Sequence, residues 1–160
     1  MNIIVLGAGA FGTAIANELS VNTENNAVLF SRNKEKVNEI NSHNTNKSCF
    51  PNKHLTKHLR ATFDKTEIQS ADVIFIALPS PVIVENLKSL KPYFSKSVLL
   101  VNLSKGLLDN GETIVDRVKA ELNTENVVAL KGPSFAAVSY THLRAHETDS
   151  YLVCRLLLEK

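Results

Sequence analysis

The sequence predicts an α/β fold built on an open, doubly wound and mostly parallel sheet, and three observations support this prediction. Short apolar runs rich in β-branched residues recur along the chain, helical patterns separate them, and the first run leads directly into a glycine-rich turn. Such runs are typical of strands buried on both faces of a parallel sheet. Because right-handed crossovers join parallel strands, we expect the strand order 3-2-1-4-5-6.

The first half of the chain contains two strand-and-helix units. The first strand is expected over Asn2–Leu6, where an apolar run ends at a glycine, and a helix is expected from residue 11 to residue 19. A second strand is expected over Ala27–Ser31, and Asn33 is a candidate N-cap of the helix that follows. A long polar loop is expected over residues 41–57.

The remaining strands are expected near residues 59–62 and over 73–78, 97–103 and 127–130. Helical patterns separate the last three, which is the arrangement of right-handed βαβ units. With 160 residues, the chain is in the size range of one main folding unit with its own hydrophobic core.

The segment from Gly7 to Gly12 has the pattern G-x-G-x-x-G, and it follows an apolar strand and opens a helix. In this pattern Gly7 permits a tight turn, Gly9 lets a pyrophosphate approach the backbone, and Gly12 lets the helix lie close to the strand. Because unpaired N–H groups at a helix start attract anions, the loop predicts a Rossmann dinucleotide-binding site. The alternative is a glycine turn that binds no ligand.

The end of the second strand bears on the choice of cofactor. An NAD-specific site places a carboxylate there against the ribose 2′-hydroxyl, whereas this chain has Ser31 and Arg32. The guanidinium of Arg32 can bind a 2′-phosphate through two hydrogen bonds. We therefore expect NADP or NAD as the cofactor, with NADP(H) accepted. Alternatively, Arg32 is an ordinary solvated residue at a strand end.

Ligands of a doubly wound sheet lie outside the carboxyl ends of the strands. Three loops follow strands there: Pro79–Ser80–Pro81, which can begin a helix close to the cofactor, residues 102–106, and residues 131–136. Lys105 brings an ammonium group to this edge, where it can bind an anion or polarise a reacting oxygen. Each loop alone could be an ordinary connection, but we expect the three to form one site.

Composition and charge exclude other classes of function. A formal charge of +2, with scattered Lys and Arg, argues against a nucleic-acid partner, and no apolar run approaches the ~20 residues that span a membrane. Two cysteines, Cys49 and Cys154, lack metal-ligand spacing and favour a reducing compartment, so we expect a cytoplasmic location. The five histidines show no triad or metal pattern, and no metal is expected.

Taken together, several short motifs make residues 1–136 similar to the N-terminal domain of bacterial NAD(P)-dependent glycerol-3-phosphate dehydrogenase. These motifs are Gly7-Ala8-Gly9-Ala10-Phe11-Gly12-Thr13-Ala14, Ser31-Arg32, Cys49-Phe50-Pro51, Ala77-Leu78-Pro79-Ser80, Ser104-Lys105-Gly106-Leu107 and Gly132-Pro133-Ser134-Phe135-Ala136. Three positions depart from the family pattern: Ala10, Cys49 and Lys131.

The resemblance implies an enzyme that interconverts dihydroxyacetone phosphate and sn-glycerol 3-phosphate. It further implies that the cofactor is contacted by Ala10, Phe11, Arg32, Lys105 and Ala136, in addition to the glycine loop and Pro79. The triose phosphate would be bound by Lys105, Gly132 and Ser134, with Lys105 as the catalytic candidate. The resemblance is compatible with a homodimer in the full-length enzyme.

After residue 136 the sequence leaves the family pattern, and residues 137–160 look like a translated adapter attached to a truncated sequence. The alternative is a divergent amphipathic helix over residues 151–160. In the family, a helical second domain supplies the proton-transferring lysine, so we expect this chain to bind cofactor and to lack activity. Two other functions stay open: a non-catalytic NAD(P)-binding module, and a dehydrogenase of another hydroxy acid.

Overall fold

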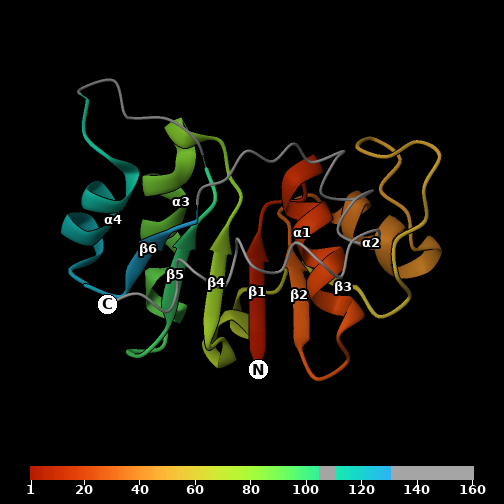
Figure 1. Ribbon diagram of the computed structural model, residues 1–160, viewed down its shortest axis with the longest axis horizontal. Helices are drawn as coiled ribbons and strands as arrows, with labels where there is room; N and C mark the ends of the chain where they lie inside the picture. The colour runs from red at the N-terminus through yellow and green to blue at the C-terminus, as the bar shows by residue number, and fades with distance from the viewer. Residues whose placement is uncertain (105–110, 131–160) are drawn as a thin grey trace, which may run out of the picture.

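The computed structural model describes residues 1–104 and 111–130 of the chain. These residues form a six-stranded parallel sheet with helices on both faces (Figure 1). The strands are β1 (Asn2–Leu6), β2 (Asn26–Phe30), β3 (Arg60–Thr62), β4 (Val73–Ile76), β5 (Leu99–Asn102) and β6 (Val127–Ala129). Their order is β3-β2-β1-β4-β5-β6 and all neighbours are parallel, which confirms the predicted topology.

The helices alternate with the strands as predicted. The described α-helices are α1 (Ala10–Val21), α2 (Lys34–His43), α3 (Ile83–Leu90) and α4 (Ile114–Leu122), with short 3-10 helices η1 (Lys65–Ser70), η2 (Ser80–Val82) and η3 (Lys91–Tyr93). Several bounds differ from the sequence prediction: α1 extends beyond residues 11–19 at both ends, and β4, β5 and β6 are shorter than the predicted 73–78, 97–103 and 127–130. Strand β2 ends at Phe30 rather than at Ser31, and the polar loop predicted from residue 41 starts only after α2 ends at His43.

Local capping explains where α2 and α4 begin and end. The side chain of Asn33 accepts a hydrogen bond from the backbone N–H of Lys36 at 3.0 Å, and Thr113 caps α4 in the same way. Both helices end at an asparagine with a positive φ of 52°, Asn44 after α2 and Asn123 after α4. Asparagine tolerates this left-handed conformation better than most residues, so these positions stop the helices.

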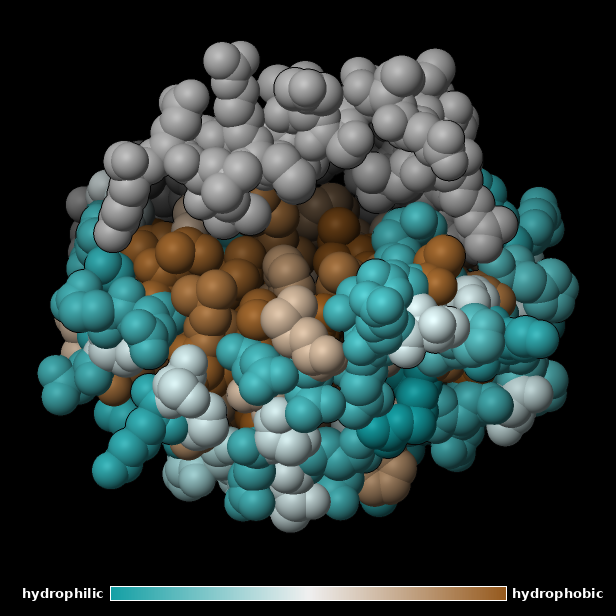
Figure 2. Space-filling model, turned by 60° about the horizontal axis from the view of Figure 1, so that its bottom comes forward, coloured by the Kyte–Doolittle hydropathy of each residue, from teal (hydrophilic) through white to brown (hydrophobic). Residues whose placement is uncertain are grey.

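The two faces of the sheet are covered differently along its width. On the face that packs against α3 and α4, residues in one register row are buried from β2 to β6: Val28, Ile4, Ile74, Leu100 and Val127. On the opposite face, α1 and α2 cover the β1–β3 half, whereas Val128 of β6 is 42% exposed. Figure 2 shows that, on the face in view, the largest apolar area is continuous.

The carboxyl ends of the central strands meet at one edge of the sheet. The N–H of Ala77 donates to the carbonyl of Leu6 at 2.9 Å, and the N–H of Leu103 donates to the carbonyl of Ile76 at 3.0 Å. The loops that leave β1, β4 and β5 therefore start beside one another, as the sequence predicted. Within the described ranges, no helix is long and apolar enough to span a membrane.

Candidate functional site

Two glycines of the loop between β1 and α1 are required by close contacts. Gly7 has a φ of +111°, and a Cβ atom there would lie 2.5 Å from the carbonyl oxygen of Ala77. A Cβ atom on Gly12 would lie 2.0 Å from the carbonyl oxygen of Gly7, so only glycine lets α1 start this close to the strand. The predicted structural roles of both glycines are confirmed.

Gly9 differs from both, because a Cβ atom there would meet nothing within 4 Å. The open space lies where α1 begins, and Gly9 is the N-cap residue of that helix with no side-chain hydrogen bond to cap it. The first N–H groups of an uncapped helix carry a partial positive charge and attract anions. The space above Gly9 is therefore suited to a negatively charged group.

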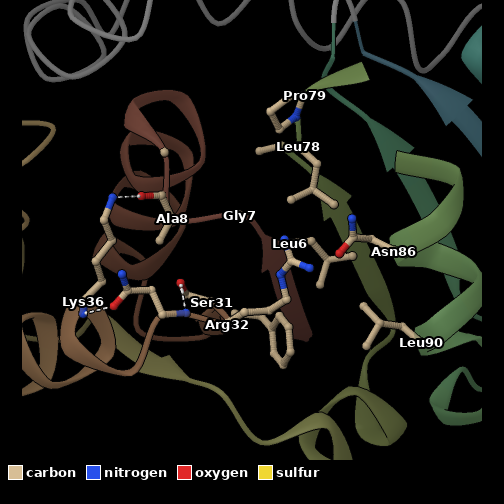
Figure 3. A pocket seen from close by; sticks show the side chains of 14 residues that line it. Leu6, Gly7, Ala8, Ser31, Arg32, Lys36, Leu78, Pro79, Asn86 and Leu90 are labelled. Atoms are coloured by element: carbon tan, nitrogen blue, oxygen red, sulfur yellow. Dashed lines mark hydrogen bonds between the residues drawn. The ribbon is translucent and has the colours of Figure 1, made fainter. Parts of the chain in front are cut away.

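A pocket of about 380 Å³ adjoins this loop, which is within the range of ligand-binding pockets (Figure 3). The glycine loop, the end of β2, the end of β4 and one side of α3 contribute its walls. The lining residues are Leu6, Gly7, Ala8, Gly9, Phe30, Ser31, Arg32, Asn33, Lys36, Ala77, Leu78, Pro79, Asn86 and Leu90.

Four residues predicted to bind cofactor, Gly7, Gly9, Arg32 and Pro79, lie together in this lining. Three others do not: Ala10 and Phe11 form the start of α1, and Gly12 is a buried residue of the same helix. The structure thus brings one part of the predicted site together at the end of β1, β2 and β4.

The pocket is positively charged. Arg32 and Lys36 line it, and no Asp or Glu is among the described lining residues. In Figure 3 the guanidinium of Arg32 extends into the pocket between Leu6 and Asn86, while Lys36 points toward Ala8 on another side. Two cationic side chains in the lining, with no carboxylate among its described residues, favour an anionic ligand.

The loop that carries Arg32 is fixed by its own side chains. The Oγ atom of Ser31 accepts a hydrogen bond from the backbone N–H of Asn33 at 3.2 Å, and Asn33 in turn caps α2. Ser31 itself is buried. These bonds set the direction in which the chain leaves β2, and thereby position Arg32 at the pocket mouth.

The long polar loop after α2 packs against the glycine loop, which its composition did not indicate. Asn46 is fully buried, and its Nδ2 atom donates to Thr13 Oγ1 at 2.9 Å and to the carbonyl oxygen of Ala8 at 3.3 Å. Cys49 is half-buried, with its Sγ atom 3.8 Å from the same carbonyl oxygen. A buried side-chain amide that bonds backbone and hydroxyl groups holds the two loops together.

The same loop is tied to α2 through Glu39. The carboxylate accepts hydrogen bonds from the backbone N–H of Lys47 at 2.8 Å and from the Thr45 hydroxyl at 2.9 Å. The bond from the Lys47 amide is the main cause that lowers the pKa of Glu39 below its ordinary value. Glu39 is thus held ionised and turned toward the loop.

Among the lining residues that sequence reasoning missed are Lys36, Asn86 and Leu90. Lys36 could have been found, because it follows Arg32 by four residues and lies in the first turn of the helix that Asn33 caps. Asn86 and Leu90 lie on α3, and their position depends on how that helix packs across the sheet. No local pattern indicates that packing.

Lys105, Gly132, Ser134 and Ala136 lie outside the described residues, so their predicted roles stay predictions. The hydroxyl of Ser104, directly before Lys105, donates to the carbonyl oxygen of Leu78 at 2.5 Å. The loop after β5 therefore starts against the loop after β4. Among the described residues, no group of three His, Cys, Asp or Glu side chains could hold a metal ion.

Comparison with known proteins assigns the family. Residues 2–144 match the family model described as NAD-dependent glycerol-3-phosphate dehydrogenase N-terminus. The glycerol-3-phosphate dehydrogenase [NAD(P)+] of Neorickettsia sennetsu is 32% identical over 158 residues, covering 94% of this chain and 47% of the relative. That of Bacillus subtilis is 33% identical, covering 84% of this chain and 40% of the relative.

Solved structures agree with these relatives. The crystal structure of glycerol-3-phosphate dehydrogenase from Coxiella burnetii matches with a TM-score of 0.77 and 27% identity, over 87% of this chain and 43% of that chain. This chain spans less than half the length of the curated relatives named above. It belongs, as its motifs predicted, to the family of N-terminal domains of NAD-dependent glycerol-3-phosphate dehydrogenases.

Proposed function

We propose that this chain forms the dinucleotide-binding part of a glycerol-3-phosphate dehydrogenase that uses NADP or NAD. One observation is the main support for the proposal. The uncapped start of α1 lies beside a pocket whose described lining residues include two cationic side chains and no carboxylate. A dinucleotide needs a cradle for its diphosphate and a neighbouring pocket for its adenosine. The family match supports the same function.

The described residues fit such a cofactor. The open space at Gly9 would receive the diphosphate against the first N–H groups of α1. Arg32 would bind the adenosine ribose or its 2′-phosphate, and Pro79 would form the wall on the β4 side. When bound, the nicotinamide ring supplies or accepts a hydride.

For the substrate, we propose dihydroxyacetone phosphate and sn-glycerol 3-phosphate, bound by Lys105, Gly132 and Ser134. The names of the relatives support this substrate pair. The bond from Ser104 to Leu78 also supports it, because it starts the lysine-bearing loop at the pocket edge. Lys105 would bind and polarise the reacting oxygen, since a lysine ammonium is a compact point charge.

Several finer predictions accompany this proposal. The division into a domain over residues 1–136 and an unrelated tail over 137–160 has its boundary outside the described residues, and the family match extends to residue 144. Reading the gene beyond codon 136 tests that division. The cytoplasmic location and the homodimer of a full-length enzyme likewise stay predictions.

Titration of the 160-residue chain with NADPH and NADH tests cofactor binding. Gly9→Val should abolish detectable binding of both, because the added side chain fills the place of the diphosphate. The fold should persist, since the space around Gly9 is open. Cofactor fluorescence measures binding, and circular dichroism checks the fold.

Thr23→Val is the matched control for that experiment. Thr23 is exposed in the turn before β2, at the opposite edge of the sheet, so its replacement should leave both titrations unchanged. Unaltered titration of Gly9→Val, or a wild-type chain that binds neither NADPH nor NADH, would refute the proposed function.

A further inference from the structure

Lys36 projects from the first turn of α2 along the pocket wall toward the glycine loop (Figure 3). Its side chain is half-buried, and the Nζ atom donates a hydrogen bond to the carbonyl oxygen of Ala8 at 3.3 Å. Its backbone N–H donates to the Asn33 cap, so the start of the helix fixes where the Lys36 side chain leaves the backbone. A second cation therefore reaches the pocket at a defined place.

The contact between Lys36 and Ala8 is replaceable. The carbonyl oxygen of Ala8 also accepts a hydrogen bond from the buried side chain of Asn46 at 3.3 Å. Since Asn46 would still donate a hydrogen bond to that oxygen, movement of the Lys36 ammonium leaves no buried acceptor unsatisfied. An ammonium has three N–H donors, and the bond to Ala8 uses one of them. Lys36 can thus turn toward a bound anion at little cost.

Arg32 lies in the short loop that joins β2 to α2, and Lys36 lies in the first turn of α2; their side chains extend along different sides of the pocket (Figure 3). The nearby carboxylate of Glu39 is bound to Lys47 and Thr45, and Glu35 is exposed and not part of the pocket lining. A phosphate monoester carries a charge of about −1.5 to −2 near pH 7, so one guanidinium leaves it incompletely neutralised. The second cation would supply the missing charge.

We propose that Lys36 is a specificity-determining residue that reads the 2′-phosphate of NADP(H) together with Arg32. Arg32 would hold the phosphate through paired hydrogen bonds, and Lys36 would act as a point charge from the opposite side. This inference depends on the proposed function, because it assigns a role within the same cofactor pocket.

Two small probes test the role of Lys36 without the nicotinamide or any catalytic step. Adenosine 2′,5′-bisphosphate carries the 2′-phosphate, and 5′-AMP lacks it. With the full chain, Lys36→Met should weaken binding of the bisphosphate at least tenfold and change binding of 5′-AMP less than twofold, as measured by isothermal titration calorimetry. Methionine keeps most of the length of the stem and removes the charge.

Lys34→Met is the matched control. Lys34 lies in the same helical turn, but its ammonium lies 5.2 Å from the ring centroid of Phe63 and outside the pocket lining. This variant should bind both probes as the wild type does. The preference for the bisphosphate is the ratio of the Kd for 5′-AMP to the Kd for the bisphosphate. Lys36→Arg retains the charge, so the logarithm of this ratio should stay at least half of its wild-type value.

The outcomes separate this inference from the proposed function. If Lys36→Met loses affinity for both probes equally, Lys36 acts on the glycine loop through Ala8, and the specificity role is wrong. Unchanged binding of both probes also overturns it. If the wild-type chain binds neither probe, the proposed cofactor pocket itself is refuted, and the role of Lys36 is refuted with it.

Discussion

The two halves of the sheet differ in how completely they are covered. One register row contains Leu29, Val5, Phe75, Val101 and Val128. Leu29 and Val5 are fully buried, Phe75 is half-buried and Val101 is buried, whereas Val128 at the end of the row is 42% exposed. The β1–β3 half has α1 and α2 on this face, whereas no described helix covers the β6 end of it.

The difference follows from the handedness of the crossovers. Connections between parallel strands are right-handed as a rule. Strands β2 and β3 are added on one side of β1, and β4 to β6 on the other. Right-handed crossovers that run in opposite directions place their helices on opposite faces of the sheet. The first half therefore covers the face on which the glycine loop begins α1, and the second half covers the other face with α3 and α4.

The largest expected effect is a loss of stability, and it is tested by comparing one glycine substitution in each half of the sheet. Gly12→Ala should destabilise the chain by at least about 3 kcal/mol, because the new Cβ would lie 2.0 Å from a backbone oxygen. The gain of about 1 kcal/mol in helix propensity is too small to offset this clash. Urea unfolding followed by circular dichroism measures the change.

Gly111→Ala, in the second half, is the comparison for that variant. Gly111 has a φ of +79° but open space around its Cβ position, so only backbone strain of about 1–2 kcal/mol is expected. Equal destabilisation by the two substitutions would show that packing of α1 on β1 does not depend on Gly12.

A smaller effect is expected within one row of the sheet. Val5→Ala should cost about 2 kcal/mol, since Val5 is fully buried under α1, whereas Val128→Ala should cost less than about 0.5 kcal/mol. The free energy of unfolding in urea measures both. If the two substitutions cost the same, the β6 end of this face is covered in solution and the contrast between the halves disappears.

A further small effect concerns the ion pair between Arg60 of β3 and Glu67 of η1 at the outer edge of the first half. Its hydrogen bond from Arg60 lowers the pKa of Glu67, and the Arg60 side chain is 49% exposed. Glu67→Gln should therefore cost less than about 1 kcal/mol at pH 7, and less in high salt.

The pH dependence of that pair has a definite sign. Because the pKa of Glu67 is lower in the folded chain, its contribution is present above the ordinary glutamate pKa of 4.5 and is lost as the pH falls through the folded value. The stability difference between wild type and Glu67→Gln should vanish in acid. A difference that persists well below pH 4 would contradict this assignment.

The sequence predicted the sheet because its signals are local. Buried β-branched runs marked the strands, and the glycine pattern marked the turn in which Gly7 and Gly12 are now seen to allow backbone contact. The Asn33 cap was also visible in sequence, because a cap forms with residues two or three positions away. Strand order followed from the rule of handedness rather than from any single residue.

Tertiary structure alone decided which distant side chains meet. The place of Asn86 in the pocket wall depends on how α3 packs on the sheet, and the bonds from Asn46 to Ala8 and Thr13 join residues more than 30 positions apart. Such contacts depend on the packing of whole elements, which local propensity does not encode. The sequence by itself therefore determined the architecture and the place of the cofactor loop, and the packing determined the walls and charge of the pocket beside it.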